Sequence, residues 1–263
     1  MIMERIYDLA LPRLSGKRIK EVRIGISLMV VELDDGSIGV TYVLRDEIDH
    51  VCSAIPQDTK IVGMPAEEVA KWALQHDNVI SSALGLAVLN AVAPFEQIEA
   101  EHNQQGITDT HNDFDAVFSV EIQPEDTIGV IGHIGPVIMR LTGKVKRMIV
   151  FERGEKIAPP DFPESKQPEL LPQCQVVFVT SASLINGTLE NLLKYCQNAR
   201  DIVMVGSSTP MYPLAFSGTK VTVLAGTKWL SEYREGILTD ISLCAGIKQM
   251  MKYGQKVTAK IEK

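Results

Sequence analysis

The residues best placed for chemistry are a histidine and a glutamate that follow two neighbouring strand-like segments. His133 lies in a glycine turn after residues 127–132, and Glu152 ends the next β-rich segment, residues 147–151. Imidazole exchanges protons near neutral pH, and burial can raise a glutamate pKa toward that range. The pair could therefore act as proton donor and acceptor in a condensation or hydrolysis. The sequence does not show that the two residues meet, and His133 also fits an ordinary turn residue.

The turn that carries His133 differs from a dinucleotide-binding fingerprint. Its glycines stand at positions 129, 132 and 135, so the spacing is G-x-x-G-x-x-G and the G-x-G step is missing. Glu152 follows Gly132 by twenty residues, the distance at which such domains place a ribose-binding acid. We interpret this segment as the opening βαβ unit of a nucleotide-type domain. Gly132 and Gly135 would let the backbone approach a ligand at a helix N-terminus.

Two further loops carry small hydroxyl residues and glycines. Parallel strands direct their carboxyl ends to one edge of a sheet, where ligands bind, so we expect all three loops to line one pocket. Such groups suit a carboxylate, a phosphate or a polar heterocycle. Simpler roles are open as well, since Asn186 and Thr188 are good helix N-caps and Gly206 can merely end a strand. The loop residues expected to bind the ligand are Gly132, Gly135, Ser181, Asn186, Gly187, Thr188, Gly206, Ser207 and Thr209.

Other motifs argue against common alternatives. The chain has no G-x-S-x-G nucleophile elbow and no G-x-x-x-x-G-K-[ST] phosphate loop. Its one metal-like cluster combines Asp109, His111, Asp113 and Asp115 with His102 upstream. Carboxylates and imidazoles in this pattern can bind a divalent ion, but polar clusters also coat surface loops. We therefore name no metal ligands.

The elements in front of this region indicate an α+β unit. A helix is expected at residues 2–11, strands at 21–33 and 37–44 around the turn Asp34-Asp35-Gly36, and a helix opening at Pro65. A second helix, capped by Ser81 or Ser82, is apolar nearly all round and should be buried. Asn90 is its strong polar group and must find partners, either in helix packing or on a ligand.

From residue 116 onward the pattern alternates between strands and helices, which predicts a parallel sheet covered by helices. Residues 96–115 are polar and are expected to form a linker or surface loop. We place the domain boundary there, with domains at 1–110 and 111–263. Strands are expected at 127–132, 147–151, 175–180, 201–206 and 219–225, and helices at 136–143, 187–197 and 230–253.

Composition and charge limit the class of protein. The net charge of −7 disfavours non-specific nucleic-acid binding, which needs a basic surface. No signal-like or membrane-length apolar segment is seen, so we expect a cytoplasmic protein without membrane contact. Cys52, Cys174, Cys196 and Cys244 form no C-x-x-C pair and are expected to be buried, reduced thiols.

Several of these segments resemble the putative heavy-metal chelation domain family. They are residues 176–193, which include Asn186-Gly-Thr-Leu-Glu190, the turn 131–136, the segment 151–154 and the loop 206–210. The N-terminal half, notably residues 84–91, resembles the small domain usually fused ahead of the family's main domain. The likeness covers nearly the whole chain, and the Asn-Gly-Thr-Leu-Glu segment is its most specific part.

The resemblance implies an enolase-N-terminal-like α+β domain followed by a Rossmann-like α/β domain, with a site between them. Asn90 would be offered to that site from the first domain. The family likeness implies work on a pterin-, flavin- or siderophore-like chelator and a role in heavy-metal chelation. The matching segments hold no Cys/His/Asp cluster able to bind a soft metal, so any metal role is expected to act through an organic chelator.

Three functions stay open at this level. The chain could be a condensing or hydrolysing enzyme, a non-catalytic module for a metal or metal–chelator complex, or an enzyme using S-adenosylmethionine or NAD. The partner expected in each case is a small-molecule ligand or metal chelator. The sequence identifies neither the cofactor nor the oligomeric state. A homo-oligomer is one of the states that stay open.

Overall fold

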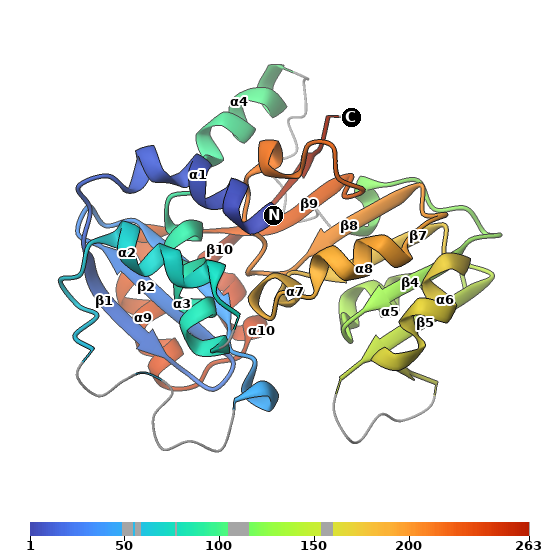
Figure 1. Ribbon diagram of the computed structural model, residues 1–263, viewed down its shortest axis with the longest axis horizontal. Helices are drawn as coiled ribbons and strands as arrows, with labels where there is room; N and C mark the ends of the chain where they lie inside the picture. The colour runs from blue at the N-terminus through green and yellow to red at the C-terminus, as the bar shows by residue number, and fades with distance from the viewer. Residues whose placement is uncertain (49–54, 56–58, 77, 105–115, 154–159, 263) are drawn as a thin grey trace.

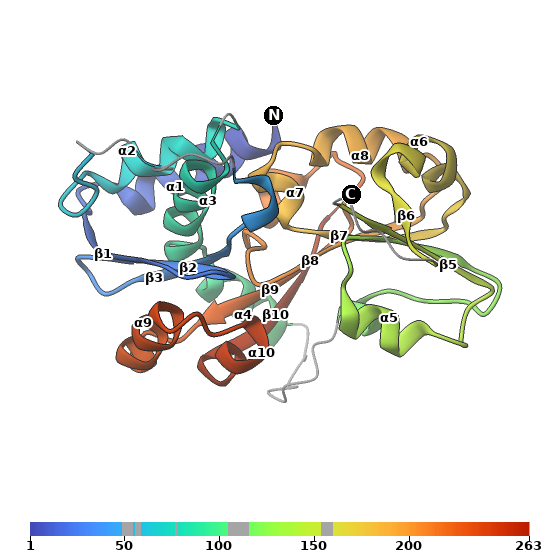
Figure 2. The same ribbon diagram turned by 90° about the horizontal axis from the view of Figure 1, so that it is seen from below.

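Two β-sheets, each with helices on both faces, make up the molecule (Figures 1 and 2). The computed structural model describes residues 1–48, 55, 59–76, 78–104, 116–153 and 160–262. The N-terminal part contains a small antiparallel sheet, and the C-terminal part contains a larger, mostly parallel one. The chain is therefore a two-part α/β protein, as predicted at this level. The domain boundary at residue 110 stays a prediction.

The small sheet has three antiparallel strands in the order β1-β2-β3. Its turn at Gly36 was predicted correctly: Gly36 has φ +87°, and the N–H of Leu33 donates to the carbonyl of Ser37 at 2.9 Å. The single strand expected at 21–33 was wrong, because the chain turns at Gly25 and forms two strands. The strands are β1 (Ile19–Ile24), β2 (Leu28–Leu33) and β3 (Ile38–Tyr42).

One face of this sheet packs against helices from the N-terminal part. They are α1 (Ile2–Leu14), α2 (Ala66–Ala70), which begins after Pro65, and α3 (Val79–Ala91). The α3 helix is almost entirely buried, as its apolar sequence predicts. Its cap is not Ser81 or Ser82 but Asn78, whose Oδ1 accepts the N–H groups of Ile80 and Ser81 at 3.0 and 3.1 Å.

The larger sheet has seven strands in the order β10-β9-β8-β7-β4-β5-β6, and only β10 runs antiparallel to its neighbour. The last predicted strand lies four residues later than expected, and β6 and β10 were not predicted. The strands are β4 (Thr127–Ile131), β5 (Arg147–Glu152), β6 (Phe162–Pro163), β7 (Val176–Thr180), β8 (Asp201–Val205), β9 (Val223–Trp229) and β10 (Gly254–Lys260).

Helices cover both faces of this sheet (Figure 2). One face packs on α5 through Val137 and Leu141, and the other packs on α6 and α8 through Leu170 and Leu192. The helices are α5 (Gly135–Leu141), α6 (Gln167–Leu170), α7 (Ala182–Ile185) and α8 (Leu189–Tyr195). Short 3-10 turns lie at η1 (Arg45–Glu47), η2 (Lys71–Leu74), η3 (Ala116–Ser119), η4 (Glu164–Lys166), η5 (Leu171–Gln173), η6 (Pro213–Phe216), η7 (Ser231–Tyr233) and η8 (Met251–Tyr253).

The long helix expected at 230–253 is instead two short helices that return to the N-terminal sheet. These are α9 (Arg234–Ser242) and α10 (Ile247–Met250). Ile237 and Ile241 of α9 pack on Leu28 and Val30 of β2 in one apolar cluster. The side chain of Arg234 also donates to Glu32 of β2 at 2.8 Å. The small sheet therefore depends on both ends of the chain.

Two further expectations were wrong. Residues 95–104 form the helix α4 (Phe95–Gln104) and not a loop. Its Ile98 is buried, and its Glu99 binds Lys228 of β9 at 2.5 Å, so tertiary contacts stabilise a segment whose sequence is mostly polar. Cys174 and Cys196 are buried as expected, but Cys244 is exposed. Cys52 lies outside the described residues.

Among the described residues, no single helix has the length and hydropathy of a membrane span. In the described part of the chain, one pair of helices, α3 and residues 95–103, meets these criteria when the two are taken together. The two helices are bent by 48° relative to each other, and the match rests on length and composition alone.

Candidate functional site

The strand order of the larger sheet reverses between β4 and β7. The chain proceeds from β4 outward to β5 and β6, then returns to β7 and continues through β8 to β9 on the other side. The loop after β4 touches the carboxyl end of β7, since a Cβ at Gly132 would lie 3.1 Å from Cγ2 of Thr180. Gly132 has φ +85°, which favours glycine, and its N–H donates to the Phe151 carbonyl at 2.8 Å. Open parallel sheets bind ligands at this kind of switch point.

The ring of His133 pairs with Asp161 and not with Glu152. Nδ1 of His133 lies 3.0 Å from Oδ2 of Asp161, with the imidazole 58% exposed and the aspartate 16% exposed. Glu152 instead accepts backbone N–H groups from His133 at 2.7 Å and from Arg153 at 3.0 Å. Glu152 therefore holds the backbone of the turn, while Asp161 is the group that can orient and polarise the imidazole.

The loop between α7 and α8 faces the N-terminal part. The amide of Asn186 donates to both oxygens of Glu47, at 3.0 and 3.3 Å, and its Oδ1 accepts the hydroxyl of Thr188 at 2.8 Å. Gly187 has φ +69°, and a Cβ there would lie 2.7 Å from Cδ2 of His76. Thr188 occupies the N-cap position of α8, but its hydroxyl makes no capping bond. The loop thus contacts two segments of the N-terminal part.

Arg153 extends this polar network across the edge of the sheet. Its guanidinium binds Glu47 at 2.6 Å and Glu164 at 2.5 Å. Burial lowers the pKa of Arg153, but hydrogen bonds to Glu164 and Glu47 outweigh that effect and raise it. Glu47 is therefore shared between an arginine from β5 and an amide from the α7–α8 loop, so one carboxylate joins both parts of the chain.

The loop after β8 lies against the N-terminal sheet. Gly206 has φ +145°, and a Cβ there would lie 2.5 Å from Oγ of the buried Ser181. Ser208, which sequence reasoning did not select, accepts the backbone N–H of Tyr42 at 2.7 Å through its hydroxyl. Ser207 is partly exposed beside it. This close fit explains the glycine at 206 without reference to a ligand.

Asn90 joins the same loop to the small sheet. Its amide group donates to the carbonyl of Val40 at 3.3 Å and to that of Ser208 at 3.2 Å. Asn90 is 8% exposed, and its Oδ1 has no partner among the described residues. The hydroxyl of Thr209 is likewise buried without a partner in the described part of the chain. Asn90 therefore has the packing role, and its free oxygen leaves the ligand-facing role open.

The structure thus brings the loops after β4, β5 and β7 together and places the loop after β8 and Asn90 at the contact between the two parts. Gly135 begins α5, and its N–H donates to the carbonyl of His133 at 3.0 Å. Sequence reasoning missed Asp161, Arg153 and Glu47. Asp161 lies in a proline-rich loop and Glu47 in a single 3-10 turn, so no local sequence pattern indicated either residue. Arg153 did have such an indication, because it directly follows Glu152.

Metal binding by clustered side chains is not seen in the described residues, where no three or more His, Cys, Asp or Glu side chains gather around one point. The metal-like positions 109, 111, 113 and 115 lie outside those residues.

This geometry defines a two-part α/β protein with polar loops along the carboxyl edge of its parallel sheet. Comparison with known families agrees: residues 115–260 and residues 7–93 each match a family described as putative heavy-metal chelation. The chain belongs to this family.

Three similar proteins are described as uncharacterized or of unknown function. The chain is 27% identical over 237 residues to an uncharacterized protein of Methanocaldococcus jannaschii, covering 87% of this chain and 86% of that protein. A solved protein of unknown function from Pyrococcus horikoshii aligns with a TM-score of 0.80 at 23% identity, over 99% of this chain and 100% of that one. One from Desulfitobacterium hafniense aligns with a TM-score of 0.75 at 22% identity, over 98% of each. At these identities the structural likeness shows the fold alone.

Proposed function

We propose that the chain is a small-molecule enzyme whose site lies at the carboxyl edge of the parallel sheet, in a crevice between a Rossmann-like domain and an enolase-N-terminal-like domain. The observation that carries this proposal is the 3.0 Å contact between His133 and Asp161 beside the β4–β7 switch point. A carboxylate that orients an exposed imidazole is the arrangement used for general acid–base catalysis.

The proposed chemistry is proton transfer in a condensation or hydrolysis. With Nδ1 directed to Asp161, Nε2 of His133 is the ring nitrogen that can give a proton to the ligand or take one from it. Asp161 then stabilises the imidazolium that forms. Within the described residues, Nε2 has no hydrogen-bond partner.

The proposed ligand is a pterin-, flavin- or siderophore-like chelator. Such molecules present flat polar rings or paired oxygens, which suit the amides, hydroxyls and backbone N–H groups of the three loops. The family description supports a role in heavy-metal chelation. We assign that role to an organic chelator because the described residues along this edge include no group of three or more His, Cys, Asp or Glu side chains that could hold a metal ion.

Ligand screening followed by substitution of His133 tests this function. We would screen riboflavin, a simple pterin and acetohydroxamate by thermal shift, since a ligand at a hundred times its Kd adds about 2.7 kcal/mol of stability. For a ligand that binds, His133→Ala should abolish turnover. Asp8→Asn, on the exposed face of α1, is the control for a lost surface charge. Full turnover in His133→Ala would refute the catalytic role.

A binding module without chemistry is the second candidate, and the position of Glu152 favours it. Both oxygens of Glu152 bind backbone N–H groups, so the expected second acid–base group already has a structural role. This candidate predicts tight, stoichiometric binding of a metal–chelator complex with the ligand recovered unchanged. Use of S-adenosylmethionine or NAD stays a prediction, and the same screen tests it with each cofactor.

A further inference from the structure

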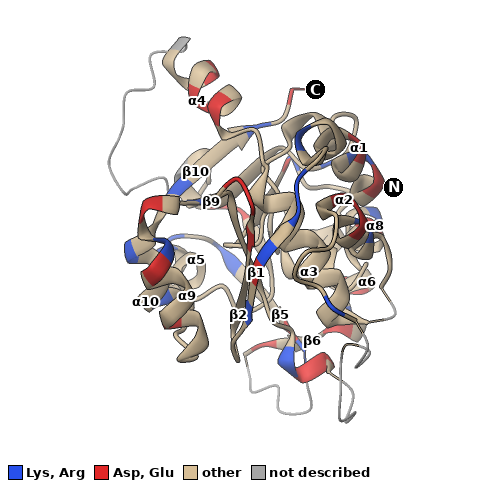
Figure 3. Ribbon diagram, turned by 90° about the vertical axis from the view of Figure 1, so that its left-hand side faces the viewer, with Lys and Arg blue, Asp and Glu red and all other residues tan. Residues whose placement is uncertain are grey.

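In the described part of the chain, no strand pairs with the outer side of β1, which lies on the side of the molecule away from the proposed site (Figures 1 and 3). The N–H of Gly25 donates to the carbonyl of Leu28 at 2.9 Å, which sets the pairing between β1 and β2. Residue pairs in antiparallel strands alternate between hydrogen-bonded and non-hydrogen-bonded, so the backbone groups of Glu21 and Arg23 form hydrogen bonds with β2. Val22 and Ile24 then direct their backbone N–H and C=O groups outward.

The stretch of β1 without a partner among the described residues is short. Ile19 is already covered, because its N–H donates to Met64 at 3.0 Å and its carbonyl accepts from Gly63 at 2.8 Å. The turn begins at Gly25. Among the described residues, the regular stretch without a backbone partner on this side is therefore residues 21–24, since the register of β1 on β2 is irregular between Ile19 and Glu21. A second β1 strand, running antiparallel about a two-fold axis at Val22, would place Val22 opposite Val22 and Glu21 opposite Arg23.

Charge selects this register over its neighbours. With Val22 opposite Val22 of a second copy, each Glu21 lies opposite an Arg23 in a non-hydrogen-bonded pair, where side chains are closest. Moving the axis by one residue would place Glu21 opposite Glu21, or Arg23 opposite Arg23, and like charges directly opposite are destabilising. Within one chain, Arg23 Nε lies 3.4 Å from Glu21 Oε1, so both side chains already point to one face.

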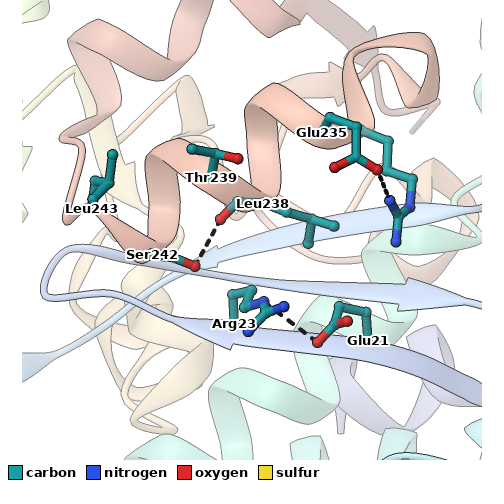
Figure 4. Close-up of a pocket in the computed structure, with 8 residues that line it drawn as sticks. Glu21, Arg23, Glu235, Leu238, Thr239, Ser242 and Leu243 are labelled. Carbon is teal, nitrogen blue, oxygen red and sulfur yellow. Dashed lines mark hydrogen bonds and ion pairs between the residues drawn. The ribbon is translucent and has the colours of Figure 1, made fainter.

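The surroundings of the strand fit the same partner. A hollow of about 370 Å³ lies between β1 and α9 and is lined by Glu21, Arg23 and residues of α9 (Figure 4). Ile24 and Ile26 are 43% and 54% exposed at the end of the strand, and Leu243 at the end of α9 is 75% exposed. Pairing through β1 would join the two small sheets into one and place both α9 helices on the face that carries Glu21 and Arg23, whereas Ile24 lies on the opposite face.

We infer that the chain forms a symmetric dimer in which the β1 strands of two copies pair antiparallel about Val22. Charged residues on an edge strand normally prevent pairing, and here they would disfavour the two neighbouring registers. The inference is independent of the proposed function, since the β1 edge and the His133 site share no residue.

Charge reversal on the strand provides the test. Wild-type protein should give a mass near twice the 29.0 kDa of one chain by light scattering at micromolar concentration. Glu21→Arg and Arg23→Glu should each weaken the dimer at least about tenfold, because two attractive pairs become repulsive. A mixture of these two variants should dimerise again, since every cross-strand pair is then of opposite charge. The double variant E21R/R23E should also dimerise.

A backbone variant tests the hydrogen bonds separately. Val22→Pro removes an N–H that points away from β2, so the fold should survive while the dimer is lost, and Val22→Thr serves as the control that keeps the N–H. Circular dichroism checks folding in each case. A monomeric wild-type protein at 100 µM concentration would overturn the inference. So would a dimer that the single charge reversals leave intact, or two single variants that stay monomeric when mixed.

Discussion

Oδ2 of Asp161 lies 3.0 Å from Nδ1 of His133, although 28 residues separate them along the chain. The pairing of β5 with β6 produces this contact, because Phe162, next to Asp161, lies opposite Phe151. The contact gives His133 a carboxylate partner at the edge where ligands of parallel sheets bind. Its consequences for activity can be measured directly.

Asp161→Asn should impair catalysis far more than binding. The amide keeps the size of the side chain but cannot stabilise an imidazolium, so we expect kcat to fall by about 10²–10⁴-fold. Dissociation constants for the same ligand should change by less than about threefold, since Asp161 orients the ring and does not contact the ligand in this mechanism. Steady-state kinetics and calorimetry measure the two quantities. Equal losses in kcat and in affinity would show that Asp161 binds the ligand.

The contact between Gly187 and His76 should contribute to stability. Gly187→Ala forces an alanine into the left-handed backbone conformation and places its methyl group 2.7 Å from the His76 ring. We therefore expect the free energy of unfolding to fall by about 2–4 kcal/mol. Gly143→Ala is the matched control, because Gly143 has φ +76° and open space around its Cβ position. The control should cost about 1–2 kcal/mol. Urea denaturation measures both, and equal losses would contradict a contribution from the contact.

The pair formed by Asp126 and Arg200 should make stability depend on pH. Both Asp126 oxygens bind the guanidinium, at 2.7 and 2.6 Å, and Asp126 is 4% exposed. The Arg200 hydrogen bonds hold the pKa of Asp126 below its usual range. The stabilisation is therefore complete above the unfolded pKa of about 4 and is lost as pH falls further.

Asp126→Asn tests this dependence. At pH 7 we expect a loss of about 1.5–3 kcal/mol, because the buried Asp126 carboxylate loses two charge-assisted hydrogen bonds from the partly exposed Arg200. The gap between wild type and variant should shrink when unfolding is repeated near pH 3. Glu169→Gln, which removes an exposed pair with Lys166, should cost less than about 1 kcal/mol. A gap that stays constant with pH would argue against ionised Asp126 as the source.

The cysteines should differ sharply in reactivity. Burial raises the pKa of Cys174 and of Cys196 to about 12, whereas Cys244 is exposed. At pH 8 only about one in ten thousand of the buried thiols is thiolate, the reactive form. Iodoacetamide should therefore label Cys244 in the native protein and should reach Cys174 and Cys196 only after denaturation. Peptide mass spectrometry locates the label, and rapid native labelling of Cys174 would contradict this account.

The sequence predicts those elements whose pattern is local. The apolar run of α3 and the β-branched strands β4, β5, β7 and β8 carry their own periodicity, so their positions were close to correct. The helix α4 and the strand β10 are mostly polar. They are stabilised by partners far along the chain, such as Lys228 for α4 and β9 for β10. No local pattern marks such elements.

The site shows the same division. The glycines at 132, 187 and 206 were visible because their conformations require glycine, and all three have positive φ. The partners of His133 and Asn186 were not visible, because Asp161 and Glu47 reach the site only through tertiary structure. His133 and Glu152 meet through the backbone N–H of His133 and not through its imidazole, a contact that sequence patterns do not encode.

Amide hydrogen exchange with a bound ligand tests the location of the site most directly. The protein would be compared with and without the tightest-binding member of the pterin, flavin and hydroxamate panel. We expect slower exchange in residues 132–135, 180–188 and 206–209, the three loops at the carboxyl edge of the sheet. Protection confined to other segments, such as the hollow beside α9, would contradict a binding site at this edge.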